Sequence, residues 1–277
     1  MKSALNFVPP ITFVLHQFAF SAFSMSHVPL LLRKKIPRDS GTLTRLLFLC
    51  LVSVSGIVAT NMGLKYESSG IGAVLTYTQP LFVFCLAAPF LKEEVSAIKL
   101  LGAVLGFIGV AVLFLGKLGS FTPFSYSFPL LILGAFFWAL TVVYYKGALS
   151  RVNPVVFNFF RVCIGCLPLA ALSLLTFSFA FPMKDLYLGL LLYSSLGSVT
   201  VGFTIWTYLL KEEDATVLSA SSFIVPIFAL LFGWQLLGED IGLTSVLGSG
   251  IILTGISLVN HKGATRTARS RGELEKP

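Results

Sequence analysis

Charged residues are scarce in this sequence. Over 277 residues, Asp, Glu, Lys and Arg make up 12% of the chain, hydrophobic residues make up 56%, and the mean hydropathy is +0.88. Soluble globular domains carry roughly 25% charged residues. The composition therefore argues against a soluble fold. It predicts the all-α class, as a polytopic helical membrane protein whose 24 glycines let helices approach closely.

Cysteine is also sparse, and its placement does not indicate a disulfide framework. The four cysteines, Cys50, Cys85, Cys163 and Cys166, all fall inside apolar runs. Cys163 and Cys166 form a CxxC, a spacing found in redox and metal sites. A structural zinc site needs four ligands, however, and no second pair has a suitable spacing. We expect these side chains to pack among helices and predict no metal site.

Sequence signatures of catalysis are missing as well. There is no Walker A motif, no HExxH zinc motif and no serine-nucleophile motif. ATP-driven pumping and intramembrane proteolysis therefore have no support. We predict a protein that is not an enzyme, with no catalytic residue and no cofactor.

The net charge of +8 is better explained by membrane topology than by nucleic acid. Nucleic-acid binding requires basic residues gathered on one water-facing surface, whereas these lie in short loops between apolar runs. Cytoplasmic loops of membrane proteins carry an excess of Lys and Arg. With the C-terminus in the cytoplasm, 15 of the 20 basic residues lie inside, Arg161 lies within a span, and 4 lie outside: Lys2, Lys65, Lys117 and Lys184. The sequence predicts a multi-pass cell-membrane protein with a cytoplasmic C-terminus.

Apolar runs of about 20 residues, the length that crosses a bilayer, predict nine spans. They cover residues 9–32, 42–64, 69–91, 97–115, 128–146, 154–177, 186–210, 216–237 and 241–260. We divide the chain into a first repeat of four spans (1–119), a second repeat of five spans (120–261) and a polar cytoplasmic tail (262–277) that we expect to be disordered.

This division rests on an internal repeat at an offset of 146 residues. Its spacings of 13, 9 and 7 recur unchanged in the two halves. Corresponding segments are five spans apart, an odd number, so we expect the two copies to cross the bilayer in opposite directions. Inverted repeats are typical of secondary transporters, whose site lies near the midplane and opens to each side in turn. The matched pairs are Pro80 with Pro226, Glu93 with Glu239, Gly102 with Gly248, and Gly109 with Gly255.

This succession of Pro, Glu, Gly and Gly across a helix pair resembles EamA-type permeases of the drug/metabolite transporter superfamily. The resemblance covers residues 7 to 260 and includes the segment from Pro154 to Arg161. It implies ten spans in two five-helix halves, so the first helix of that pattern is absent here. Three explanations of the missing helix remain open: a start placed too far downstream, a truncated gene, or a functional form with nine helices.

Arg161 is the one basic residue well inside a predicted span. A central Arg costs about 3 kcal/mol to insert, so it should face protein or water and have a partner. In one interpretation the guanidinium pairs with an anionic substrate. In the other it snorkels to the cytoplasmic interface or bonds to helix carbonyls. Asn158 is three residues earlier and hence on the same helix face. His16 occupies the position in the first half that aligns with Arg161. Its imidazole either titrates near neutral pH or makes a structural hydrogen bond, and the sequence leaves both roles open.

Prolines mark a second candidate region. Pro80 and Pro226 each lie mid-span, where proline removes a backbone hydrogen bond and kinks a helix. We expect both kinks to bend toward one central cavity, with packing alone as the alternative. Weaker cavity candidates near these prolines and elsewhere are Tyr77, Gln79, Ser222, Trp138 and Trp206.

The remaining repeat residues have structural explanations. Glu93 and Glu239 sit at junctions where a carboxylate favours the N-terminal end of the following helix. Gly102 and Gly106 form a GxxxG suited to close helix packing.

The resemblance implies a secondary transporter that exports amino acids or related metabolites. The alternative is a truncated, non-transporting membrane protein or assembly partner. The expected partners are a small-molecule substrate and the lipid bilayer, with a second copy of the chain as a further candidate and no nucleic acid.

Overall fold

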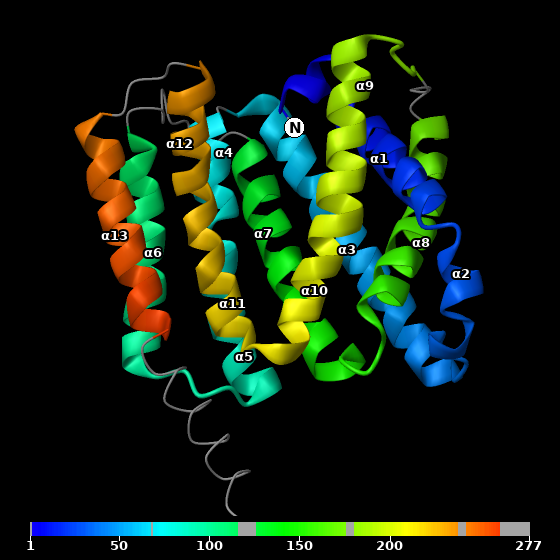
Figure 1. Cartoon of the computed structure of the whole chain (residues 1–277), viewed down its shortest axis with the longest axis horizontal. Coiled ribbons are helices and arrows are strands. Elements are labelled where there is room, and N and C mark those ends of the chain that lie inside the picture. Colours follow the sequence, from blue (N-terminus) through cyan, green and yellow to red (C-terminus); the bar gives the residue numbers. More distant parts are fainter. Residues whose placement is uncertain (1, 68, 116–125, 176–179, 238–241, 261–277) are drawn as a thin grey trace, which may run out of the picture. The chain divides into compact units, whose positions relative to one another are not determined.

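The structure is helical throughout the part of the chain that it describes. The computed structural model describes residues 2–67, 69–115, 126–175, 180–237 and 242–260, and no strand occurs within them. The expected all-α class is confirmed. The helices of Figure 1 are η1 (Lys2–Asn6), α1 (Pro10–Ser24), α2 (Val28–Leu31), η2 (Arg33–Lys35), α3 (Ser40–Tyr66), α4 (Ser69–Thr76), α5 (Gln79–Leu91), α6 (Ala97–Leu113), α7 (Ser127–Tyr144), η4 (Tyr145–Leu149), α8 (Pro154–Leu175), α9 (Asp185–Leu192), η5 (Tyr193–Gly202), α10 (Phe203–Glu212), α11 (Ala215–Ser221), η6 (Ser222–Ile224), α12 (Val225–Leu237) and α13 (Leu243–Asn260).

Within these residues, seven helical stretches are long and apolar enough to cross a membrane. They are Ser40–Tyr66, Ile71–Leu91, Ser127–Leu149, Pro154–Leu175, Asp185–Glu212, Ala215–Phe232 and Leu243–Asn260.

The expected count of nine spans is not confirmed, because two of the predicted spans are shorter than expected. Helix α6 has 17 residues, or about 26 Å at 1.5 Å per residue. The expected span at 9–32 is divided: α1 ends at Ser24, and a separate four-residue helix, α2, begins with Pro29 in its first turn.

The helices form two compact units. Unit 1 comprises residues 1–67 and 123–212, and unit 2 comprises residues 68–122 and 213–277. Each unit takes helices from both predicted repeats, because the units divide the molecule in space whereas the repeats divide the sequence. The domain boundaries drawn from the sequence therefore stay predictions, and the tail from 262 lies outside the described residues.

Unit 1 is built around α3, which packs along α7 and against α8. The α3–α7 approach depends on Gly56, where a Cβ would lie 2.9 Å from Cβ of Phe137. Helix α3 begins after Asp39, whose carboxylate accepts a hydrogen bond from the backbone N–H of Thr42 at 2.7 Å. Hydrogen bonding from Thr42 holds the pKa of the Asp39 carboxyl below its usual range.

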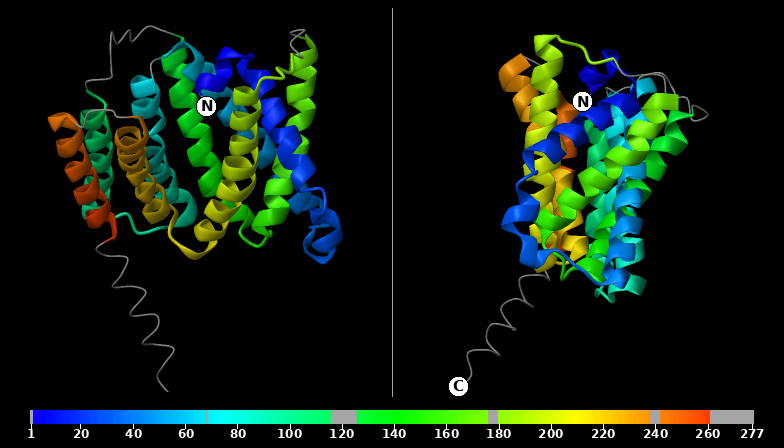
Figure 2. Two further views of the ribbon diagram at one scale, coloured as in Figure 1. Left: turned by 45° about the horizontal axis from the view of Figure 1, so that its top comes forward. Right: turned by 90° about the vertical axis from the view of Figure 1, so that its right-hand side faces the viewer.

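Unit 2 contains a seam of glycines between α6 and α13, which lie side by side (Figures 1 and 2). A Cβ on Gly102 would lie 2.6 Å from the carbonyl oxygen of Gly255, and one on Gly109 would lie 2.9 Å from that of Gly248. Backbone therefore meets backbone at both ends of the seam. This is the close packing that small residues permit inside membranes.

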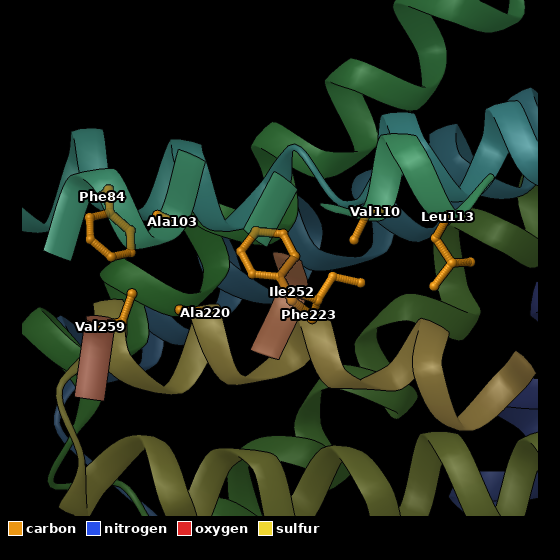
Figure 3. Packing of buried hydrophobic residues seen from close by; sticks show 8 residues of the cluster. All are labelled: Phe84, Ala103, Val110, Leu113, Ala220, Phe223, Ile252 and Val259. Carbon is orange, nitrogen blue, oxygen red and sulfur yellow. The ribbon is translucent and has the colours of Figure 1, made fainter. Parts of the chain in front are cut away.

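The core of unit 2 surrounds Phe223, which is fully buried. Its ring lies against Gly106, where a Cβ would approach Cδ2 of Phe223 to 2.6 Å. Both glycines of the expected GxxxG motif thus serve packing. The buried cluster, shown in Figure 3, consists of Phe84, Ala103, Val110, Leu113, Ala220, Phe223, Ile252 and Val259.

Two spans of unit 2 are interrupted next to a proline. The first breaks between α4 and α5, and Pro80 is in the first turn of α5. The second passes through the 3-10 turn η6, and Pro226 is in the first turn of α12. Pro80 and Pro226 are both buried. Side-chain hydroxyls bond to the backbone beside each interruption: that of Thr78 donates to the carbonyl of Leu75 at 2.6 Å, and that of Ser222 donates to the carbonyl of Ser219 at 2.6 Å.

The role expected for Glu93 needs a correction. Its carboxylate does lie at a helix N-terminus, but the helix is α11 and not the α6 that follows it in sequence. It accepts from the backbone N–H groups of Ala215 and Thr216 at 2.8 and 3.1 Å. The following helix is capped instead by Ser96, which accepts from the N–H of Lys99 at 3.3 Å. The equivalent Glu239 lies outside the described residues.

Candidate functional site

Arg161 is the largest of the fully buried side chains that the structure describes, with 1% of its surface exposed. It projects from α8, two turns after Pro154. No carboxylate in the described part of the chain pairs with its guanidinium. Its charge is therefore held by neutral groups, an unusual arrangement for a cation in a protein interior.

Asn158 is the principal hydrogen-bonding partner of Arg161. Its Oδ1 accepts from Nε of Arg161 at 3.2 Å and from Nη2 at 2.8 Å. The two side chains share a helix face, as their spacing predicts. Asn158 also donates through Nδ2 to the carbonyls of Val199 and Thr200, at 2.8 and 3.1 Å, and to Oγ1 of Thr204 at 2.9 Å. It therefore joins Arg161 to the neighbouring span.

That neighbouring span contains η5, a π-helical stretch of ten residues. Long π-helices are rare, and single π-turns concentrate at functional sites. The wider turn leaves backbone carbonyls free to accept hydrogen bonds from other helices. The carbonyls of Val199 and Thr200 accept from Nδ2 of Asn158, and that of Ser195 accepts from the hydroxyl of Ser21 at 2.9 Å. Three backbone carbonyls of η5 thus accept hydrogen bonds from α1 and α8.

Aromatic rings complete the surroundings of Arg161. Its Cζ lies 3.6 Å from the ring centroid of Phe203 and 5.2 Å from that of Phe18. A guanidinium over an aromatic face is stabilised by about 0.5 to 2 kcal/mol, more when desolvated. Phe203 follows η5 directly at the start of α10.

A small cavity of about 10 Å³ lies beside this site, within unit 1. Phe203 lines it, and Arg161 does not. Both tryptophans chosen from the sequence, Trp138 and Trp206, are in its wall. The lining residues are Trp138, Thr141, Val142, Tyr145, Phe157, Phe203, Trp206, Thr207 and Leu210.

His16 lies elsewhere in unit 1. Its Nδ1 is 2.6 Å from the hydroxyl of Tyr187, and its ring packs edge-on against Phe181 with centroids 4.9 Å apart. This is the structural hydrogen bond left open by the sequence.

The other candidates from the sequence belong to unit 2. Tyr77 packs against Phe223 with ring centroids 6.2 Å apart. Gln79 is buried, and its Nε2 has no acceptor among the described residues. Ser222 donates to the carbonyl of Ser219 at 2.6 Å. None of these residues lines the pocket of unit 1, so their roles stay predictions.

Sequence reasoning missed Phe203, Phe157 and Tyr145. The rings of Phe157 and Tyr145 stack at 4.8 Å, and Phe157 also contacts Phe203. One signal was available, because Phe203 and Trp206 are three residues apart on one helix and so share a face.

The sequence matches the EamA-like transporter family over residues 1–115 and 126–261. An "Uncharacterized transporter" of Archaeoglobus fulgidus is 30% identical over 95% of this chain and 92% of its own length. The "Uncharacterized transporter YoaV" of Bacillus subtilis is 27% identical over 92% of this chain and 89% of its own length.

A solved structure described only as "Crystal structure of protein" superposes with a TM-score of 0.77 at 19% identity, covering 99% of this chain and 92% of its own. At that identity it supports the fold alone. The family match, the named relatives and the apolar helices agree with one another, and the chain belongs to the EamA-like transporter family of membrane proteins.

Proposed function

We propose that this protein is a secondary transporter that moves small metabolites across the cell membrane by alternating access, exporting amino acids or related compounds. Family membership supports transport in general. The substrate class is what the family resemblance implies, the chemistry around Arg161 agrees with it, and the mechanism is our inference from the sequence repeat.

The observation that carries the mechanism is the exchanged pairing of four glycines. At the repeat offset of 146, Gly102 is equivalent to Gly248 and Gly109 to Gly255. In the α6–α13 seam, Gly102 meets Gly255 and Gly109 meets Gly248. Each contact is therefore the repeat-equivalent of the other, which is the pattern of two segments related by a two-fold axis and running in opposite directions. Inverted repeats of this kind support alternating access.

The interrupted spans of unit 2 support the same relationship. The break at Tyr77–Thr78 and the turn at Ser222–Ile224 fall at equivalent positions of the two copies, each just before its proline. Discontinuous helices are a recurrent feature of transporters, where their ends line substrate and ion sites.

The surroundings of Arg161 support a substrate that carries a carboxylate. A buried guanidinium without a carboxylate partner in the described chain can form bidentate bonds with one. Beside it lies a small cavity with aromatic walls, lined in part by Trp138, Phe203 and Trp206. We further propose that the C-terminus is cytoplasmic, because this orientation places 15 basic residues inside and 4 outside.

Counterflow in vesicles tests the function. The purified protein is reconstituted into vesicles loaded with an unlabelled amino-acid mixture, and uptake of each labelled amino acid is followed in turn. Saturable counterflow that is absent from protein-free vesicles supports the proposal. Lack of counterflow for every amino acid, with the protein folded and inserted, would favour the non-transporting alternative.

A further inference from the structure

Basic residues gather in unit 1 where the chain leads from α2 into α3. Between Arg33 and Asp39, four residues are Lys or Arg and one is acidic. The side chains of Arg33, Lys35 and Arg38 are exposed. No carboxylate in the described part of the chain forms an ion pair with any of these three side chains. The stretch therefore presents concentrated positive charge to its surroundings.

The one acidic residue of this stretch is engaged with its own helix. Asp39 is the N-cap of α3, and its carboxylate accepts a hydrogen bond from the backbone N–H of Thr42 at 2.7 Å. A carboxylate in this position is stabilised by the unpaired N–H groups and the dipole of the helix. Asp39 therefore serves the start of α3 and forms no ion pair with the neighbouring cations.

An outward-facing apolar surface lies directly before these cations. Helix α2 packs against α8 at the margin of unit 1 (Figure 1) and buries Val28. Leu30 and Leu31 face outward, with 84% and 74% of their surfaces exposed. Arg33 follows Leu31 by two residues, which is about 4 Å along a 3-10 helix. Interfacial helices sink about 5 to 10 Å into the boundary between headgroups and acyl chains, so the change from apolar to basic occurs within the thickness of that boundary.

An anionic phospholipid matches both surfaces. Its acyl chains are apolar, as are Leu30 and Leu31. Its phosphate accepts bidentate hydrogen bonds from Arg and pairs with Lys as a point charge. An acidic protein would match the cations but would leave the adjoining apolar pair without a role. The two surfaces together therefore favour a lipid.

We infer that Arg33, Lys35 and Arg38 form a binding site for the headgroup of an anionic phospholipid, whose acyl chains lie along Leu30 and Leu31. Basic residues clustered beside a span attract anionic lipids, with a gain in binding of about fivefold for each cation near the membrane surface. The inference names a lipid partner of the protein and does not depend on the proposed transport.

Native mass spectrometry of the full-length protein tests this inference. Protein stripped of lipid in detergent receives equal amounts of phosphatidylglycerol and phosphatidylcholine with identical acyl chains. The measured quantity is the ratio of the two lipids that stay bound. Because the lipids differ only in the headgroup, this ratio reports recognition of the headgroup alone.

Two triple variants that remove the same positive charge are compared. The cluster variant is Arg33→Gln/Lys35→Gln/Arg38→Gln. The control variant changes three exposed basic residues that are scattered over unit 1, as Lys65→Gln/Arg151→Gln/Lys184→Gln.

The wild type and the control variant should retain more phosphatidylglycerol than phosphatidylcholine. The cluster variant should lower this preference by about fivefold for each cation that contacts the headgroup, hence by up to about 100-fold. Leu30→Ala/Leu31→Ala should weaken both lipids by a similar factor and leave their ratio unchanged, because the acyl chains are the same.

Equal retention of the two lipids by the wild type would overturn the inference, and so would an unchanged ratio in the cluster variant. A loss of the same size in the control variant would also overturn it, because net charge and not a site would then attract the lipid. Thermal unfolding in phosphatidylcholine alone shows whether the cluster variant folds. If it does not, the three single substitutions decide by the same ratio. Counterflow is not involved, so failure of transport would leave this result standing.

Discussion

The glycine seam of unit 2 gives a quantitative prediction. In Gly255→Ala, the new Cβ would lie 2.5 Å from the carbonyl oxygen of Gly102, 2.6 Å from the backbone N of Gly106 and 3.0 Å from its Cα. All three atoms belong to the backbone of α6, so no side-chain rotation can relieve the clash. The helices must separate instead. Overpacking of this kind costs typically 1 to 3 kcal/mol, a factor of about 5 to 150 in the unfolding equilibrium.

Gly250 provides the matched control on the same helix. A Cβ there would have nothing within 4 Å, so Gly250→Ala should be neutral or should stabilise α13 by up to about 1 kcal/mol through helix propensity. The measurement is thermal unfolding of the purified variants in detergent. Gly109→Ala, at the position equivalent to Gly255, should show a loss similar to that of Gly255→Ala. A Gly255→Ala protein as stable as Gly250→Ala would refute the packing argument.

Three further predictions concern topology, the buried cation and the capping carboxylate. A reporter that is active only in the cytoplasm should work when fused after Lys262, and an impermeant thiol reagent should label a cysteine placed at Gly119 from outside; labelling from inside would reverse the orientation. In vesicles, Arg161→Lys and Arg161→Gln should stay folded and lose affinity for carboxylate substrates, with Arg161→Gln worse; wild-type affinity in a folded Arg161→Gln protein would remove Arg161 from the site. Glu93→Gln should lower the free energy of unfolding by about 0.5 to 2 kcal/mol, as the loss of a charged helix cap does; an unchanged melting temperature would show that the cap contributes little.

The membrane fold could be predicted from sequence because a bilayer restricts the choices. Backbone groups in hydrocarbon must be satisfied within the segment, so apolar runs become helices. Lengths were harder to predict. The run at 97–115 reads as a full span but forms the 17-residue α6, because hydropathy does not record where the hydrogen-bond ladder ends. The run at 9–32 contains Pro29, which starts the separate α2.

The site was predictable in part. The spacing of Asn158 and Arg161 placed them on one face, and their hydrogen bonds agree. The role of Phe203 was not accessible, since it depends on the π-helical η5 immediately before it. A π-turn is stabilised by partners from other helices, here Ser21 and Asn158. Local sequence therefore carries no clear sign of it.

Alternating access is the central claim, and the pocket offers a direct measurement of it. Thr207 lines the pocket and is 2% exposed, so in a variant with the four native cysteines replaced by serine, Thr207→Cys is the single thiol. Impermeant thiol reagents are then added to either side of sealed vesicles. The account predicts labelling from each side, with a saturating carboxylate substrate changing the two rates in opposite directions. Labelling from one side only, unaffected by substrate, would contradict it.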